Sequence, residues 1–231
     1  MRKLPLLVIL LLPALPAALQ DSSFAAARER MVREQIAARG VTDARVLEAM
    51  RQVPRHEFVP PALAAHAYED RPLSIGHDQT ISQPFIVAFM TEQLQPRPSD
   101  VVLEIGTGSG YQAAVLAKLC REVLSIELIP ELAASARARL ARLGYRNVQV
   151  RTGDGYAGWP ERAPFTRIIV TAAPPKMPEA LVNQLAVGGV MIAPVGDVFQ
   201  ELMIVRRTRT GIVTEASIPV RFVPMIRRPG R

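Results

Sequence analysis

The sequence has few of the side chains that build metal centres or covalent cross-links. It contains one cysteine, Cys120, which excludes an internal disulfide and a cysteine-rich zinc site. Its three histidines, His56, His66 and His77, lack the spacing of a metal-binding motif such as H-E-x-x-H. We therefore expect no metal ion to be bound.

Long apolar runs and basic stretches interleaved with aromatic residues are also missing. The apolar run at residues 4–12 is too short to cross a membrane. The formal net charge is +7, but the basic residues are scattered, and no aromatic side chains alternate with them as stacking platforms. We expect neither a membrane span nor a nucleic-acid partner.

The first 27 residues differ in composition from the rest. Arg2 and Lys3, the apolar run and a Pro/Ala-rich stretch together resemble a secretory signal peptide, although no clean cleavage triplet follows. The alternative is a wrongly assigned start, with Met31 as the true initiator. We predict that residues 1–27 are a signal-like or mis-assigned extension.

Residues 28–95 form a predicted helical region with a substrate loop. Thr42 is the expected cap of the second helix, which Pro54 ends, and residues 71–84 show neither helical nor strand spacing and are predicted to be an extended loop. Helices are predicted at 24–39, 42–53, 61–68 and 85–94.

Residues 96–231 are the predicted catalytic core, because short β-branched segments there alternate with helical ones. Such alternation indicates parallel strands joined by right-handed crossovers, and the last two strands are expected to be antiparallel. The predicted fold is α/β, a doubly wound Rossmann-like sheet with a helical N-terminal extension and antiparallel C-terminal strands. Strands are predicted at 101–105, 122–127, 147–152, 167–171, 190–194, 201–207 and 212–222, with a helix at 130–144.

A glycine loop, Gly106, Gly108 and Gly110, follows the first predicted strand of this core, where open parallel sheets bind ligands. A dinucleotide loop would be G-x-G-x-x-G, but Tyr111 occupies the third glycine position. Glu104 suits a cationic amino-acid ligand better than a phosphate. The pattern Glu-x-Gly-x-Gly-x-Gly resembles the first motif of S-adenosylmethionine methyltransferases, which implies that cofactor; NAD binding and a purely structural turn are the alternatives.

Two further acids follow strand ends and are candidates for cofactor binding. Glu127 stands where such folds bind both ribose hydroxyls, although it would also favour the N-terminus of the next helix. Asp154, followed by Gly155, would accept a hydrogen bond from the adenine amino group, or simply form a turn. The predicted cofactor-binding residues are Glu104, Gly106, Gly108, Gly110, Glu127, Asp154 and Gly155.

The strings T-I-S-Q-P at residues 80–84 and T-A-A-P-P at residues 171–175 extend the resemblance. They are similar to signatures of the protein-L-isoaspartate (D-aspartate) O-methyltransferase family, and the similarity runs from about residue 31 to 228. The resemblance implies methyl transfer from S-adenosylmethionine to the α-carboxylate of L-isoaspartyl and D-aspartyl residues. The expected partners are age-damaged proteins and peptides, whose repair this reaction begins.

The resemblance implies that Ser82 is the catalytic residue, although a plain loop serine is the alternative. A carboxylate with a pKa near 4 needs no general base, so a hydroxyl of Ser82 or Thr80 would orient it. Ile81, in the same motif, and Thr171, at a strand end, are further substrate-binding candidates. Arg221 would pair with the substrate carboxylate, or be an ordinary surface arginine.

The sequence is also compatible with two other functions. One is an S-adenosylmethionine methyltransferase for a small-molecule or RNA acceptor, and the other is a non-catalytic protein that keeps the cofactor fold. We expect a monomer. A cytoplasmic location is expected because the methyl donor is made inside cells, with the periplasm as the alternative if residues 1–27 act as a signal.

Overall fold

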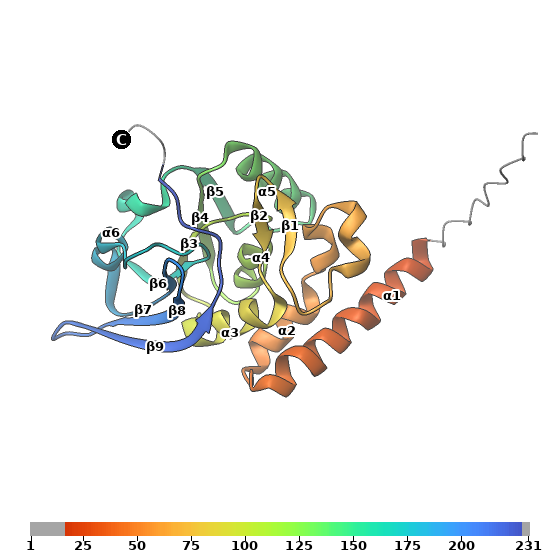
Figure 1. Cartoon of the computed structure of the whole chain (residues 1–231), viewed down its shortest axis with the longest axis horizontal. Helices are drawn as coiled ribbons and strands as arrows, with labels where there is room; N and C mark the ends of the chain where they lie inside the picture. The colour runs from red at the N-terminus through yellow and green to blue at the C-terminus, as the bar shows by residue number, and fades with distance from the viewer. Residues whose placement is uncertain (1–16, 228–231) are drawn as a thin grey trace, which may run out of the picture.

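A seven-stranded sheet forms the centre of the computed structural model, which describes residues 17–227. Its strand order is β5-β4-β3-β6-β7-β8-β9; β3 to β7 are parallel, and β8 and β9 are antiparallel to their neighbours (Figure 1). This architecture confirms the predicted fold class. The strands are β3 (Val101–Ile105), β4 (Glu122–Glu127), β5 (Val148–Thr152), β6 (Phe165–Val170), β7 (Leu185–Gly196), β8 (Gln200–Arg207) and β9 (Ile212–Val220).

Helices bury both faces of the central strands, which explains why these strands are apolar almost throughout. Val102 of β3 packs with residues of α3 (Pro84–Leu94) and α4 (Tyr111–Ala117). Leu103, the next residue, packs on the opposite face with α6 (Glu179–Asn183). The remaining core helix, α5 (Pro130–Arg142), contacts β4 and β5.

The chain changes its winding direction at β3, which lies between β4 and β6. Such a switch point opens a crevice beyond the carboxyl ends of the strands. Backbone hydrogen bonds bring the loops together there: Gly106 N donates to Ile126 O (2.8 Å), and Thr171 N donates to Ile105 O (2.9 Å). The loops after β3, β4 and β6 therefore converge at one edge of the sheet.

The N-terminal region extends away from β7 to β9 at its beginning (Figure 1), while its last helix, α3, contacts β6 and β7. Its first helix, α1 (Ala17–Arg30), continues through a π-helical segment and a 3₁₀ turn to Gly40, the predicted stop. The next helix, α2 (Ala44–Gln52), is capped by Asp43, so the predicted Thr42 cap is wrong. Short 3₁₀ segments lie at Arg55–Phe58, Pro61–His66, Gly155–Ala157 and Pro160–Arg162.

The Asp43 cap has a simple physical reason. Its carboxylate accepts a hydrogen bond from Arg45 N (2.9 Å), as an N-cap side chain should. The backbone N–H of Thr42 is instead bonded to the carboxylate of Glu92 (2.6 Å), which ties the loop to α3. A contact from a distant helix therefore moved the start of α2 by one residue.

Residues 71–84 contain an antiparallel hairpin, which corrects the predicted loop. Its strands are β1 (Leu73–Gly76) and β2 (Gln79–Ile81), too short to show a period of two. The turn residues His77 and Asp78 have φ of 53° and 56°. Asn and Gly usually occupy such turn positions, so no sequence pattern indicated this turn. The paired Leu73 and Ile81 are buried and anchor the hairpin to the N-terminal core.

The N-terminal extension is only partly described. The predicted apolar run at 4–12 lies outside the described residues, and the division into 1–27, 28–95 and 96–231 stays a prediction. Within residues 17–227, no helix is both long and apolar enough to cross a membrane. The hydrophobic core of the N-terminal region includes Tyr111 and Ala114 of α4, so this region is packed directly onto the sheet's helical layer.

Candidate active site

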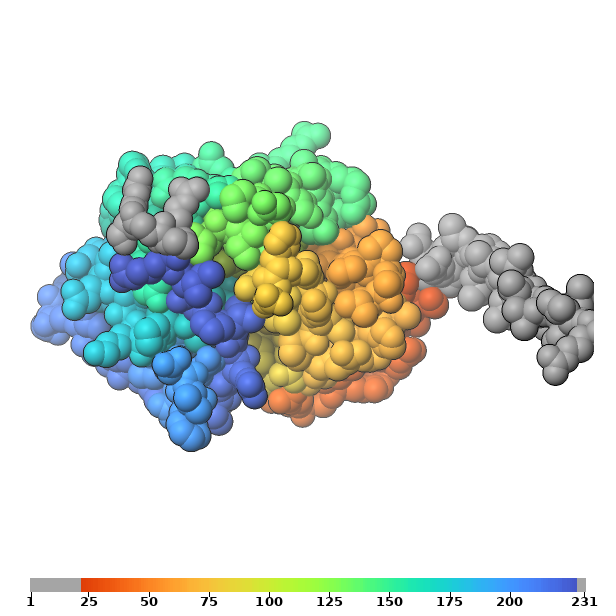
Figure 2. All heavy atoms as spheres, turned by 45° about the horizontal axis from the view of Figure 1, so that its top comes forward, coloured from red at the N-terminus to blue at the C-terminus, as the bar shows by residue number. Residues whose placement is uncertain are grey.

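A pocket opens at the carboxyl ends of the parallel strands, with a volume of about 840 Å³ including its open mouth. In Figure 2 the β1–β2 hairpin (yellow), the segment after β4 (green) and the C-terminal segment (dark blue) meet on the forward face. The lining residues come from 79–82, 105–109, 111–112, 126–129, 171–172 and 223–226, with Val87 and Gly155.

The glycine loop forms one wall of the pocket. Gly106 has φ of 97°, and a Cβ there would lie 2.6 Å from Thr171 Oγ1. The Thr171 hydroxyl donates to Gly106 O (2.6 Å), so this strand end and the loop are in direct contact. Gly108 also lines the pocket, whereas Gly110 caps α4 and faces Leu140 of α5. The loop thus presents backbone groups to a ligand at close range.

Glu104 lies beneath this loop and is fully buried. The Thr107 hydroxyl donates to Ser125 Oγ (2.5 Å), and Ser125 donates to Glu104 Oε2, while Oε1 has no hydrogen-bond partner among the described residues. Burial raises the pKa of Glu104 to about 8, against the hydrogen bond from Ser125 and with the charge of Glu127. A buried carboxyl oxygen without a donor suits a ligand that brings a cationic N–H group.

Glu127, at the end of β4, lines the pocket next to the loop. Its two oxygens accept hydrogen bonds from Gly108 N (2.7 Å) and Ile129 N (3.0 Å), which fix the carboxylate at the pocket edge. The Asp154 carboxylate accepts from Tyr156 N (2.9 Å) and caps a 3₁₀ turn, and the adjacent Gly155 is the residue that lines the pocket.

The opposite wall is formed by the hairpin strand β2 and the residue that follows it. Thr80, Ile81 and Ser82 all line the pocket, and Ser82 is partly buried. Ile81 is buried among the N-terminal core residues, so it fixes the strand. Thr80 and Ser82 are two positions apart in an extended segment, so their side chains share the face opposite to that of Ile81. These two residues are the candidates for hydroxyl groups on the pocket side.

Behind Ser82 lies Arg55, a fully buried arginine that no sequence pattern indicates. Its Nε donates to Ala67 O (2.7 Å), its Nη2 donates to Ser82 O (2.8 Å), and its Nη1 has no partner among the described residues. The guanidinium lies 4.8 Å from the ring centroid of Tyr111, and burial lowers the pKa of Arg55 to about 10. Arg55 therefore joins the serine segment to the first residue of α4.

The C-terminal segment closes the pocket. Ala173 N donates to Val223 O and Met225 N donates to Ala173 O, both at 2.8 Å, and the Tyr156 hydroxyl donates to Met225 O (2.9 Å). Ile226, in the same wall, keeps 55% of its surface exposed. Val223, Met225 and Ile226 carry no polar side chain, which is why sequence reasoning about chemistry did not select them.

The structure gathers eight of the twelve predicted site residues around the pocket. Glu104 and Gly110 lie behind the glycine loop, the Asp154 carboxylate caps a turn, and Arg221 is exposed outside the lining. The roles assigned to all twelve stay predictions. The eight that line the pocket are Thr80, Ile81, Ser82, Gly106, Gly108, Glu127, Gly155 and Thr171.

Metal chemistry has no ligand cluster in the part of the chain that the structure describes. No group of three or more His, Cys, Asp or Glu side chains there is arranged to hold an ion. Cys120 is buried, its thiol donates to Leu116 O (3.2 Å), and burial raises its pKa to about 12. This cysteine packs as a structural residue rather than a reactive thiol.

Known proteins are similar to this chain in sequence and in fold. The family model described as protein-L-isoaspartate(D-aspartate) O-methyltransferase (PCMT) matches residues 26–230. A protein-L-isoaspartate O-methyltransferase of a Synechococcus species is 57% identical over 211 residues, which cover 88% of this chain and 86% of that protein. Protein-L-isoaspartate O-methyltransferase 1 of Cupriavidus necator is 51% identical, and the match covers 96% of this chain and 92% of that protein.

A solved structure adds a match in three dimensions. The crystal structure of a beta-aspartate methyltransferase (PCMT) from Plasmodium falciparum, in complex with S-adenosyl-L-homocysteine, is 26% identical with a TM-score of 0.77. The match covers 87% of this chain and 99% of that one. On the family model and these relatives together, the chain belongs to the protein-L-isoaspartate (D-aspartate) O-methyltransferase family.

Proposed function

We propose that this pocket transfers a methyl group from S-adenosylmethionine to the α-carboxylate of L-isoaspartyl and D-aspartyl residues, which begins the repair of damaged proteins. The observation that carries the proposal is the arrangement of the pocket: the glycine loop and Glu127 face the Thr80–Ser82 segment across one cavity. The glycine loop and the T-I-S-Q-P segment, which are far apart in sequence, thus meet at one site.

The cofactor side of the pocket fits the methyl donor. Glu104 lies behind the glycine loop, and its Oε1, buried without a hydrogen-bond partner among the described residues, would accept from the donor's ammonium group. Glu127 would hold the ribose hydroxyls, and Gly106 and Gly108 leave room for a ligand against the backbone. When bound, S-adenosylmethionine supplies an electrophilic methyl carbon attached to a sulfonium.

The acceptor side needs to orient its substrate more than to activate it. A carboxylate with a pKa near 4 is already ionised at neutral pH, so no general base is required. The described residues offer no hydrogen-bond partner to the Ser82 hydroxyl, which lines the pocket and is available to a carboxylate oxygen. Arg55 fixes the Ser82 backbone from behind, and holding two reactants in line is itself a large catalytic effect.

The activity is tested by methyl transfer to an isoaspartyl peptide and to the identical peptide with normal aspartate. We expect labelled methyl groups to appear on the isoaspartyl peptide only, as a base-labile ester. Equal transfer to both peptides, or transfer to RNA or small molecules with none to the isoaspartyl peptide, would contradict the proposal.

The role of Ser82 is tested by Ser82→Ala. Loss of one hydrogen bond to a charged group, about 1.5–3 kcal/mol, should lower kcat/KM for the isoaspartyl peptide by about 10- to 100-fold. The dissociation constant of S-adenosylmethionine should stay within about twofold. The matched control is Ser74→Ala, which removes an exposed serine from β1 of the same hairpin. If both variants turn over like the parent, Ser82 is a loop serine.

The location and assembly state are further proposals. We propose a cytoplasmic monomer, because the methyl donor is synthesised inside cells. N-terminal sequencing of the mature protein would contradict this location if residues 1–27 were removed during export. Light scattering of the purified chain tests the monomer.

A further inference from the structure

The turn between β7 and β8 exposes two adjacent apolar side chains almost completely. Val198 is 87% exposed and Phe199 is 90% exposed. The other large apolar residues that stand out on the described surface, among them Val187 and Ile226, are exposed by 60% or less. Adjacent, nearly bare apolar side chains on a folded surface indicate a contact with another molecule.

The backbone of this turn is fixed, so the exposure is built into the fold. Gly196 has φ of 130°, and a Cβ there would lie 1.9 Å from Phe199 O, which only glycine tolerates. On the other side of the turn, Gln200 Oε1 accepts from Phe222 N (2.6 Å) and its Nε2 donates to Phe222 O (3.1 Å).

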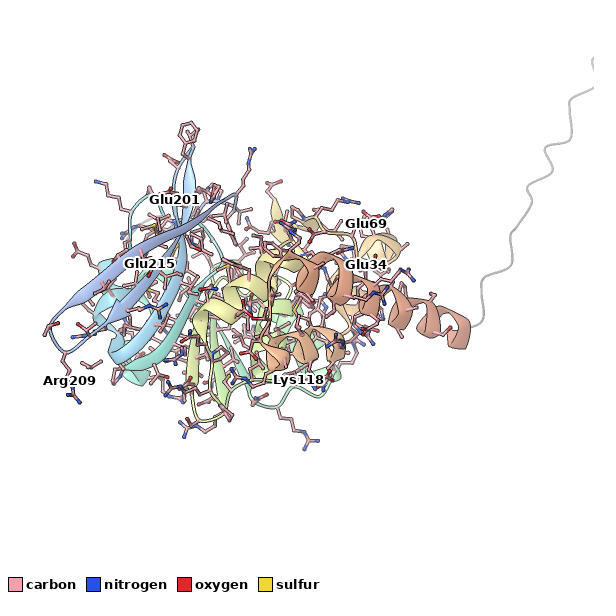
Figure 3. The ribbon with its side chains drawn as sticks, turned by 90° about the horizontal axis from the view of Figure 1, so that it is seen from below. Glu34, Glu69, Lys118, Glu201, Arg209 and Glu215 are labelled. Atoms are coloured by element: carbon pink, nitrogen blue, oxygen red, sulfur yellow. The ribbon has the colours of Figure 1, made fainter. Side chains whose placement is uncertain are left out.

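Hydrogen bonds at both ends of the turn also connect it to segments that line the pocket. Gly196 N donates to Pro174 O (3.0 Å), three residues beyond Thr171 of the pocket lining. Phe222, held by Gln200, directly precedes Val223 of the closing segment. Figure 3 shows the direction of the strands: Glu201, beside the turn, lies at one end of the β8–β9 pair and Arg209 at the other.

We propose that Val198 and Phe199 form a docking surface for the polypeptide that carries the isoaspartyl residue, contacting apolar side chains of an unfolded segment beside it. The proposal rests on the proposed function. A pocket that takes one residue of a longer chain must let that chain leave across its rim, and Val223 of the lining directly follows Phe222, which Gln200 holds beside the turn. Unfolded segments expose the apolar side chains that such a surface would bind, and folded ones bury them.

The test compares substrates of different reach on the double variant Val198→Ser/Phe199→Ser. One isoaspartyl peptide has two residues on either side, which extend about 7 Å. A second has about ten residues on either side with several apolar side chains, and a third is equally long but polar. We expect a rise in KM of about 5- to 20-fold for the long apolar peptide only, with kcat unchanged, because partial burial of two apolar side chains is lost.

The matched control is Val187→Ser, an exposed valine near the other end of β7. It should leave all three KM values unchanged. An unchanged KM for the long apolar peptide, or equal rises for all three, would overturn the docking surface while leaving the methyl transfer intact. A dimeric parent that becomes monomeric in the double variant would also overturn it, because the turn would then bind a second copy. Failure of the parent on every peptide would instead contradict the proposed function.

Discussion

The two walls of the pocket obtain their residues in different ways. The cofactor wall, residues 105–109 and 126–129, consists of two strand ends and the loops that follow them directly. The acceptor wall, residues 79–82 and 223–226, comes from a small hairpin and the C-terminal segment, with Arg55 behind it. The first wall is local in sequence, and the second is assembled from distant parts of the chain.

This difference affects how each wall is stabilised. Backbone hydrogen bonds between neighbouring strands hold the cofactor wall in place, for example the one from Gly106 N to Ile126 O. In the acceptor wall, the buried guanidinium of Arg55 donates hydrogen bonds to the carbonyls of Ala67 and Ser82. Backbone hydrogen bonds with Ala173 hold the C-terminal segment. A single side-chain change should therefore disturb the acceptor wall more than any one change disturbs the cofactor wall.

The largest expected effect is that of Arg55→Met. It leaves the carbonyls of Ala67 and Ser82 without a buried donor, at about 1–3 kcal/mol each, so we expect a loss of about 2–6 kcal/mol in the free energy of unfolding. Where the variant remains folded, KM for the isoaspartyl peptide should rise more than the dissociation constant of S-adenosylmethionine. Urea unfolding and peptide kinetics measure the two effects.

Two further variants separate charge from position at this site. Arg55→Lys keeps a cation but not the two-pronged geometry, so it should recover part of the stability and little of the peptide KM. Arg33→Met removes an exposed arginine as the matched control and should change neither quantity. Equal losses of cofactor and peptide binding in Arg55→Met would show that the two walls are not separable.

The second largest effect is expected from Gly106→Ala, which acts on the cofactor wall. The new Cβ would lie 2.6 Å from Thr171 Oγ1, in a backbone conformation that costs an alanine about 1–2 kcal/mol. We expect S-adenosylmethionine to bind at least about tenfold more weakly in calorimetry.

Gly40→Ala is the matched control for this change, because Gly40 has the same φ of 97° with nothing within 4 Å of a new Cβ. It should lose stability without losing cofactor affinity. Gly106→Ala combined with Thr171→Ala relieves the clash but not the strain, and should recover part of the binding. Unchanged binding in Gly106→Ala would contradict a ligand site on this loop.

The same contrast explains how much the sequence could predict. The strands at 101–105 and 122–127 agree with the prediction to the residue, because a buried parallel strand that ends at a glycine loop or in an acid has a local sequence pattern. The hairpin at residues 73–81 was missed, since its strands are short and its turn residues His77 and Asp78 are atypical. No local sequence pattern indicates Arg55, because its hydrogen-bond partners, Ala67 and Ser82, lie 12 and 27 residues further along the chain.

A smaller effect, on pH dependence, is expected from Glu104→Gln. With a folded pKa of about 8 against an ordinary 4.5, Glu104 keeps its proton in the folded chain while the unfolded chain loses it. Its contribution to stability is therefore fully present below pH 4.5 and falls as pH rises to about 8, by up to about 1.4 kcal/mol per pH unit.

Glu104→Gln should remove this slope, measured as the free energy of unfolding at several pH values, and Glu34→Gln, an exposed control, should retain it. Cofactor binding to the parent near pH 7 should release a proton, because a cationic ligand lowers the pKa of Glu104. Calorimetry in buffers of different ionisation enthalpy measures that proton. A slope that persists in Glu104→Gln would assign it to another group.

The smallest effect is expected from Arg221→Ala. Arg221 was predicted to pair with the substrate carboxylate, but its side chain is exposed and lies outside the pocket lining, whereas Val223 to Ile226 form the wall. An exposed charge near a site contributes little once salt screens it, so kcat/KM for the isoaspartyl peptide should change by less than about twofold. Ser82→Ala, measured in parallel, gives the scale for a residue that is proposed to contact the substrate. A loss comparable to that of Ser82→Ala would place a cation in the acceptor wall and extend that wall beyond the residues that line the pocket.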